Sequence, residues 1–112
     1  MRPNLLPTDP LTQVVFVHDY IQLAFQDTGF SIYNRLTIHQ GGDAFDRENV
    51  GFCDRLVSLI GQTVRDVGVD ASNALRLTFE NGTELCVVPD GDSVEGWQFN
   101  SLNQPAVVFQ NS

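Results

Sequence analysis

Lysine is missing from this chain, so its basic side chains are 6 arginines, set against 14 acidic residues for a formal net charge of −8. The acidic residues are scattered and form no block of like charge. Nucleic acid and anionic lipid surfaces repel a chain with this charge, so we expect neither as a partner. The acidic surface either maintains solubility or favours a basic protein partner.

Cysteine is also scarce, with only Cys53 and Cys86, which lie far apart without the C-x-x-C spacing of metal or redox motifs. No apolar run approaches the roughly 20 residues that cross a bilayer. The N-terminal residues lack the apolar core of a secretory signal. We therefore expect a cytoplasmic protein with reduced thiols.

The composition is that of an ordinary globular protein, with 42% hydrophobic and 18% charged residues in 112 positions. A chain of this length forms one modest core, so residues 1–112 are expected to be a single domain. Prolines at positions 3, 7 and 10 predict an extended, non-helical arm over residues 1–10.

The first part of the chain reads as a three-stranded meander over residues 11–39. A β-branched run, Gln13 to Val17, predicts a strand, and apolar residues alternate from Tyr20 to Phe25. The segment Gln26-Asp27-Thr28-Gly29 has the composition of a turn, and residues 30–38 read as the returning strand.

One amphipathic helix is predicted over residues 47–60, because apolar residues recur there with helical spacing: Phe52, Leu56, Leu59 and Ile60. Asp46 is the expected N-cap and Gly61 the expected C′ residue. Gly51 weakens the predicted first turn by about 1 kcal/mol relative to alanine.

Residues 64–99 predict a second meander followed by a further strand, and residues 100–112 a tail or edge strand. The dipeptide Asn81-Gly82 predicts a two-residue type I′ hairpin turn. The expected fold class is α+β: a mainly antiparallel sheet or open barrel made of two three-stranded meanders with the amphipathic helix between them.

The two predicted meanders have similar sequence patterns. With small gaps at the turns, one apolar and glycine series aligns with the other: Val15, Val17, Ile21, Leu23, Phe25, Gly29 and Ile32 with Val67, Val69, Leu75, Leu77, Phe79, Gly82 and Leu85. Two explanations remain open, an internal duplication and the general similarity of hairpins. In both, Asp27 takes the place of Asn81, and turn chemistry explains both residues.

The triplet Asp27-Thr28-Gly29 resembles the active-site motif of retroviral aspartic proteases, and Leu59-Ile60-Gly61 loosely resembles the segment behind that site. The resemblance implies a dimer in which two Asp27 carboxylates share a proton. Gln26 and Phe30 depart from the family's pattern, and the second triplet falls at the end of the predicted helix. We therefore interpret Asp27 as a turn residue and keep a dimeric aspartic-type hydrolase as the alternative.

No other pattern predicts catalysis, a cofactor or a metal. The pair His18-Asp19 and the isolated His39 lack a nucleophile at a defensible spacing, and metal binding would require His18, His39, Asp43 and Asp46 to converge. Residues 90–96 lack the full ligand pattern of a calcium loop. Trp97 and Phe99 are expected in the core. No site residue of any of these kinds is predicted.

Residues 59–99 contain an apolar-Gly start, a Leu-x-Leu-x-Phe-x-x-Gly-x-x-Leu hairpin and Glu-x-Trp. This pattern resembles small uncharacterised bacterial domains, some of which look like immunity proteins of toxin systems. The resemblance implies a non-catalytic protein-binding domain, such as an acidic inhibitor of a basic partner; a structural or assembly subunit is a further alternative. Residues 14–17 and 107–109 are apolar on both faces, so these strands are central or covered by a partner, and we expect a homodimer.

Overall fold

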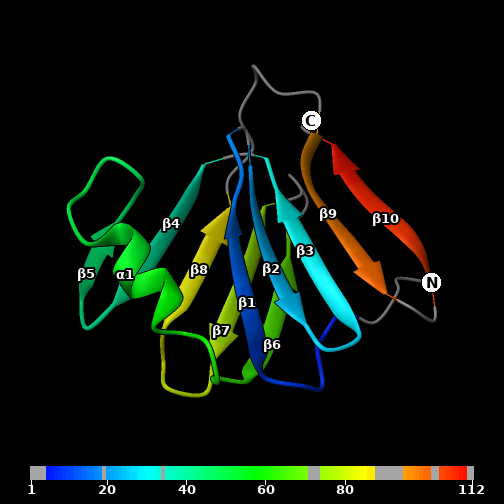
Figure 1. The fold of residues 1–112 in the computed structure, drawn as a ribbon, viewed down its shortest axis with the longest axis horizontal. Helices are drawn as coiled ribbons and strands as arrows, with labels where there is room; N and C mark the ends of the chain where they lie inside the picture. Colours follow the sequence, from blue (N-terminus) through cyan, green and yellow to red (C-terminus); the bar gives the residue numbers. More distant parts are fainter. Residues whose placement is uncertain are drawn as a thin grey trace.

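Ten strands and one short helix are formed by the residues that the computed structural model describes, and they build two antiparallel sheets (Figure 1). The described residues are 5–18, 20–33, 35–70, 74–87, 95–101 and 104–110.

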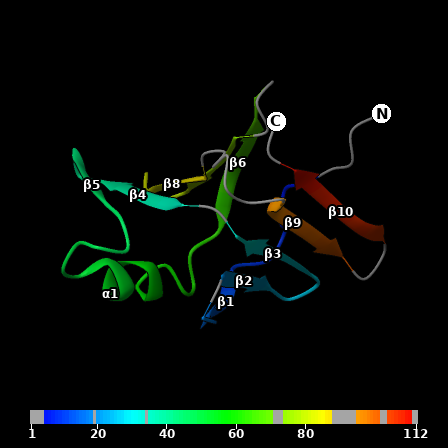
Figure 2. The same cartoon turned by 90° about the horizontal axis from the view of Figure 1, so that it is seen from above.

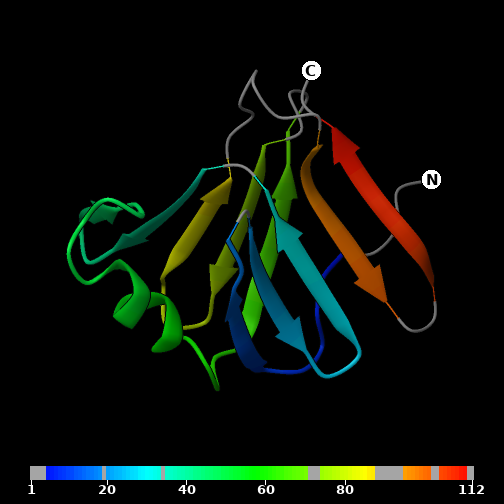
Figure 3. The same cartoon turned by 45° about the horizontal axis from the view of Figure 1, so that its top comes forward.

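The first sheet has the strand order β1-β2-β3-β9-β10. Its strands are β1 (Leu11–Phe16), β2 (Ile21–Phe25), β3 (Thr28–Ile32), β9 (Glu95–Ser101) and β10 (Gln104–Gln110). The hairpin of β9 and β10, orange and red in Figure 3, completes this sheet beside β3.

The second sheet has the order β5-β4-β8-β7-β6. Its strands are β4 (Leu36–Gln40), β5 (Asp43–Phe45), β6 (Val64–Val69), β7 (Leu75–Phe79) and β8 (Glu84–Val87). Seen from above, the two sheets are separate layers with α1 (Phe52–Val57) beside β1 and the β4–β5 hairpin (Figure 2). The mainly antiparallel prediction is confirmed, but the open-barrel version is wrong because the sheets do not close on each other.

The core lies between the sheets and is filled by every second residue of the strands. Phe30 occupies its centre on the first sheet, with ring centroids 6.3 Å from Phe25, 6.1 Å from Trp97 and 5.1 Å from Phe99. All four side chains are buried. Trp97 and Phe99 therefore belong to the core, as predicted.

The predicted strand over residues 30–38 is divided between the two sheets. Phe30 and Ile32 are buried in β3, and Leu36 and Ile38 are buried in β4. Period-two alternation continues across the break because both sheets face one core. The sequence pattern therefore resembled one strand, although the chain changes sheets after Ile32.

The helix is much shorter than the predicted 47–60. Gly51 is its N-cap residue with φ 89°, a left-handed conformation that breaks any helix entering from residue 47. The predicted N-cap, Asp46, instead accepts hydrogen bonds from the Glu48 amide (3.0 Å) and the Arg35 guanidinium (2.9 Å). These contacts hold the pKa of Asp46 below its usual value, with the Glu48 amide as the larger cause.

After α1 the chain continues in tight turns to Gly61, which has φ 95° and donates its N–H to the Leu11 carbonyl (2.8 Å). Gly61 is thus a turn residue some way past the helix end and not its C′ residue. Phe52, Leu56 and Leu59 are buried as the helical pattern predicted, but Ile60 is 43% exposed. The helix is anchored by Arg55, whose guanidinium lies 3.9 Å from the centre of the Phe45 ring.

The second predicted hairpin has a longer loop than a type I′ turn. The Phe79 N–H donates to the Thr83 carbonyl (2.8 Å), and the Gly82 N–H donates to the Phe79 carbonyl (2.9 Å). Gly82 has φ 92°, which is the left-handed bulge residue of a three-residue loop. Gly29, by contrast, lies inside β3 opposite Ala24 and has no positive φ, so the predicted turn over residues 26–29 is shorter than expected.

The two halves of the fold share the same strand registers. Leu11 pairs with Phe25 ahead of a bulge, and Val64 pairs with Phe79 ahead of a bulge at the same place. Each three-stranded meander is extended by a hairpin from the other half of the chain. The β9–β10 hairpin pairs with β3, and the β4–β5 hairpin pairs with β8.

These registers correct the alignment of the two meanders that was made from the sequence, which is shifted by one residue in the first strands. Val14 pairs with Leu23 as Val67 pairs with Leu77, so Val14, and not Val15, is the equivalent of Val67. In the third strands the equivalent of Leu85 is Phe30, because these residues face Leu77 and Leu23.

Replacing Phe30 tests the shared core. Phe30→Ala is expected to lower the free energy of unfolding by about 3–5 kcal/mol, because it empties the centre of the aromatic cluster. Urea unfolding measures this. Val50→Ala is the control, since Val50 is 97% exposed and its removal should change stability by less than about 0.5 kcal/mol. Equal effects of both substitutions would contradict this description of the core.

Candidate functional site

Asp27 lies exposed at the tip of the β2–β3 hairpin, in a two-residue loop with Gln26. Thr28 follows as the first residue of β3, and its buried hydroxyl has no hydrogen-bond partner. Neither of the two surface hollows described below is lined by Asp27. The position is that of a turn residue and supplies no enclosed site for a carboxylate.

The other polar candidates are dispersed. His18 lies exposed in the β1–β2 turn, His39 is exposed on β4, and Asp46 is held by Arg35. Among the described residues, no group of three or more His, Cys, Asp or Glu side chains gathers where a metal ion would bind. Asp19 and residues 90–94 lie outside the described residues.

The outer face of the second sheet is charged. Arg76 and Glu84 lie on adjacent strands, with 3.9 Å between Nε and Oε1, and Cys86 pairs with Arg76 across the same strands. A hollow of about 360 Å³ is lined there by Gly68, Arg76, Cys86 and their neighbours. Burial raises the pKa of the Cys86 thiol, Glu84 raises it further, and Arg76 lowers it. Such a thiol is a poor nucleophile.

The outer face of the first sheet carries no charge in its described side chains. On the strands β1, β2, β3 and β9, the residues that alternate with the core residues are Gln13, Val15, Gln22, Ala24, Gly29, Ser31, Gln98 and Asn100. We call these eight residues the neutral face. A hollow of about 130 Å³ on this face is lined by residues of all four strands, from Gln13 and Val15 of β1 to Asn100 of β9. In a chain with a net charge of −8, this face is the exception.

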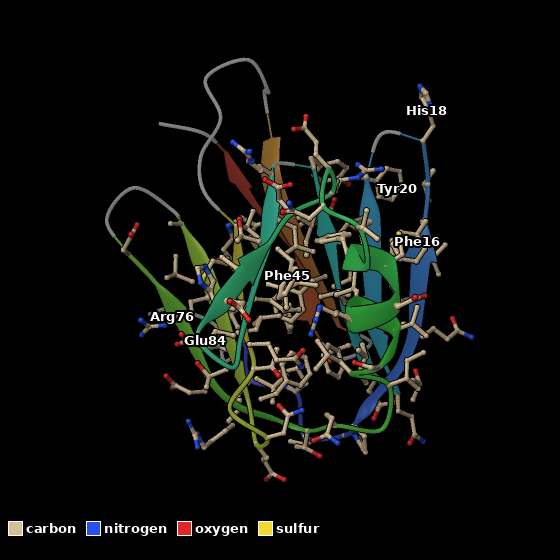
Figure 4. The ribbon with its side chains drawn as sticks, turned by 90° about the vertical axis from the view of Figure 1, so that its left-hand side faces the viewer. Phe16, His18, Tyr20, Phe45, Arg76 and Glu84 are labelled. Atoms are coloured by element: carbon tan, nitrogen blue, oxygen red, sulfur yellow. The ribbon has the colours of Figure 1, made fainter. Side chains whose placement is uncertain are left out.

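The neutral face ends at β1, the edge strand of the first sheet. Val15 is 37% exposed and Phe16 is 42% exposed. Figure 4 shows Phe16 on β1 at one side of α1 and Phe45 at the other. On the helix, Val57 (44% exposed) and Ile60 (43% exposed) add apolar surface. The strand predicted to be central or covered by a partner is therefore not central.

The backbone of β1 has open hydrogen-bonding groups. Val17 and Tyr20 exchange two backbone hydrogen bonds (2.9 and 3.3 Å) across the turn to β2. Because bonded pairs alternate in an antiparallel ladder, Val15 is bonded to β2, and the N–H and C=O groups of Val14 and Phe16 point to the open edge. Leu11 is bonded to Gly61 and Gln62 instead. The β1 edge, residues 13–17, begins where that cover ends.

The other three edge strands carry devices that discourage strand pairing. β5 has three residues and begins with Asp43, β6 has Arg65 and Asp66 beside a bulge, and β10 has Pro105 and two register shifts. Charges, prolines, bulges and short length are the usual protections of sheet edges. Strand β1 shares the bulge of β6, between Leu11 and Gln13. Among the edges that the structure describes, however, β1 is the strand that has neither a charged residue nor a proline.

The fold is that of a small two-sheet β domain, and its distinctive surface is an open sheet edge beside an uncharged sheet face. The chain belongs to a family of unknown function, DUF6188, whose model matches residues 8–110. No curated protein and no solved structure matches it. These comparisons show no immunity-protein likeness for residues 59–99. No helix among the described residues has the length and apolar character to cross a membrane.

Sequence reasoning found the apolar character of residues 14–17 but named no site residues. The neutral face was missed because its residues come from four strands, and only the sheet order brings β9 beside β3. The signal in the sequence was the absence of charge between Leu11 and Val17.

Thiol labelling tests the electrostatics of the second sheet. In Cys53→Ser protein, alkylation of Cys86 should have its midpoint at a higher pH than that of a free cysteine, about 8.5. Glu84→Gln should move the midpoint down and Arg76→Gln should move it up, because the two charges act in opposite directions on the thiolate. Iodoacetamide rates between about pH 7 and pH 10 measure this. Identical profiles for the two variants would contradict the arrangement.

Substitution of Asp27 tests the turn interpretation. We expect no cleavage of casein at about pH 4–6, the range in which carboxylate dyads act. Asp27→Asn should unfold within about 0.5 kcal/mol of the unchanged protein because the side chain is exposed. Proteolysis that this substitution abolishes would establish the hydrolase in its place.

Proposed function

We propose that this chain is a non-catalytic protein-binding domain that receives a partner at the β1 edge and the adjoining neutral face. The proposal is carried by the β1 edge, where the backbone groups of Val14 and Phe16 face away from β2 and no described strand lies beside them. The side chains of Val15 and Phe16 are exposed there. Addition of a strand to such an edge is a common mode of protein recognition.

The charge distribution favours a neutral contact over an acidic inhibitor of a basic partner. Arg35 pairs with Asp46 and Arg76 lies near Glu84, so some of the acids already face the chain's own arginines. Residues 11–17 contain no acid. A complex at this surface should therefore depend weakly on salt, whereas binding of a basic partner by scattered acids weakens steeply as salt is added.

The β2–β3 tip supports the non-catalytic reading. Asp27 is exposed there and belongs to a short loop, whereas a catalytic carboxylate dyad depends on close approach of two carboxylates in a water-restricted site. A structural or assembly role is a special case of binding at the β1 edge and needs no different surface.

Capture from host lysate tests the proposal when the bound protein is identified and its binding is mapped. Val15→Lys and Phe16→Lys should each reduce the captured amount at least about tenfold, since a charge on an edge strand blocks pairing. Val50→Lys introduces the same charge at a residue that is 97% exposed between β5 and α1, and should bind like the unchanged chain.

Hydrogen exchange completes the test. The amides of Val14 and Phe16 should become protected in the complex, while exposed turn amides such as that of Gln26 keep their rates. A complex that forms equally well with both β1 variants, or one that is lost on raising the salt concentration, would reject this surface; the second result would support the basic-partner alternative.

A further inference from the structure

The occupant of the β1 edge can be inferred from the same residues. We propose that it is a second copy of this chain, with the two β1 strands antiparallel across a twofold axis at Val15. This inference rests on the proposed function, since it names the partner of the same surface. The two first sheets would then form one continuous sheet across the axis.

The open part of β1 is symmetric about Val15. It cannot extend toward the N-terminus, because the backbone of Leu11 is bonded to Gly61 and Gln62 (2.8 and 2.9 Å). It ends at Val17, where the turn to β2 begins. The middle residue of the segment 13–17 is Val15. Antiparallel pairing of two copies of this segment about Val15 therefore uses all five residues of each copy.

The hydrogen-bonding pattern fits this register. With Val15 opposite the partner's Val15, the edge-facing groups of Val14 meet those of the partner's Phe16, and Phe16 meets the partner's Val14. Each of these pairs exchanges two bonds, giving about four backbone hydrogen bonds in total. In a register shifted by one residue, the backbone groups of Val15, which are already bonded to β2, would lie opposite the edge-facing groups of the partner strand. The four hydrogen bonds between the strands would then not form.

The charge distribution argues for a copy of this chain over a charged partner. Two molecules of net charge −8 repel each other, so they associate only where neither presents charge. The β1 edge and the neutral face meet this condition, because their described residues are uncharged. A basic protein would find no carboxylate to pair with here.

The second half of the chain supplies an internal comparison. Strand β6 holds in the second sheet the place that β1 holds in the first, and its Asp66 corresponds by register to Gln13. On the neighbouring strand β7, the Arg76 side chain lies over Gly68. Its Nη2 atom is 3.4 Å from the position that a Cβ atom on Gly68 would take. The residues in the corresponding positions of the first sheet are Gln22 and the exposed Val15. The β6 edge therefore carries charges that discourage strand pairing, whereas the corresponding β1 edge carries none.

The contact is short and its affinity is correspondingly modest. Five residues on each strand, with Val57 of α1 nearby as further apolar surface, form an interface at the small end of the specific range. Sedimentation should therefore show a monomer at about 5 μM and a growing dimer fraction toward about 500 μM, as weak interfaces do.

Charge substitution at the axis tests the register. Val15→Lys and Val15→Glu should each weaken self-association at least about tenfold, because each places two like charges directly opposite each other. An equimolar mixture of the two variants should dimerise again, since opposite charges then face each other. Val50→Lys, with the same change at a 97% exposed residue, should dimerise like the unchanged chain. Circular dichroism and thermal unfolding check that each variant is folded.

The outcomes are decisive in both directions. Recovery in the mixture supports the antiparallel β1 pair at Val15. A monomer at every concentration, a dimer indifferent to Val15→Lys, or no recovery on mixing would overturn it. If the chain is monomeric but Val15→Lys still loses an identified host protein, the second-copy inference fails while the proposed function stands. If neither dimer nor captured protein depends on Val15, both fail.

Discussion

The two sheets are held together by hairpins that each half of the chain contributes to the other half's sheet. After Ile32 the chain leaves the first sheet for the second, and β9 later returns to pair with β3. Neither half can therefore cover its own core, because each sheet contains strands of both. The aromatic cluster around Phe30 joins the two halves directly, since Trp97 and Phe99 come from the second half.

Local patterns predicted most elements of this fold, but not the short strand β5 and not the assembly of the sheets. Period-two alternation located β2 and β7, and helical spacing located the buried side of α1, because each pattern is set by neighbours in the sequence. The break between β3 and β4 was missed since both strands face the same core and preserve the alternation. The helix length was overestimated because a left-handed Gly51 is not distinguishable in sequence from a tolerated helical glycine.

The candidate surface was predicted only in part, for a related reason. Residues 14–17 are conspicuous in sequence because they are apolar without interruption. Whether such a strand is central or at an edge depends on sheet order, and that order follows from pairings between distant residues. The neutral face depends on it further, since Asn100 and Gln22 share a face only because β9 is paired with β3.

The unequal protection of the four edges also limits how far assembly can proceed. When a sheet edge pairs antiparallel with the same edge of a second copy, both edges are covered by the contact. Neither copy can then add a third through that edge, so the dimer has closed twofold symmetry. Growth would then require β10, β5 or β6. Pro105 removes a backbone donor from β10, β5 is short and begins with Asp43, and Arg65 and Asp66 place charges on β6. The proposed pairing through residues 13–17 would therefore end at two copies, and it would leave no unprotected edge among the described strands for further growth.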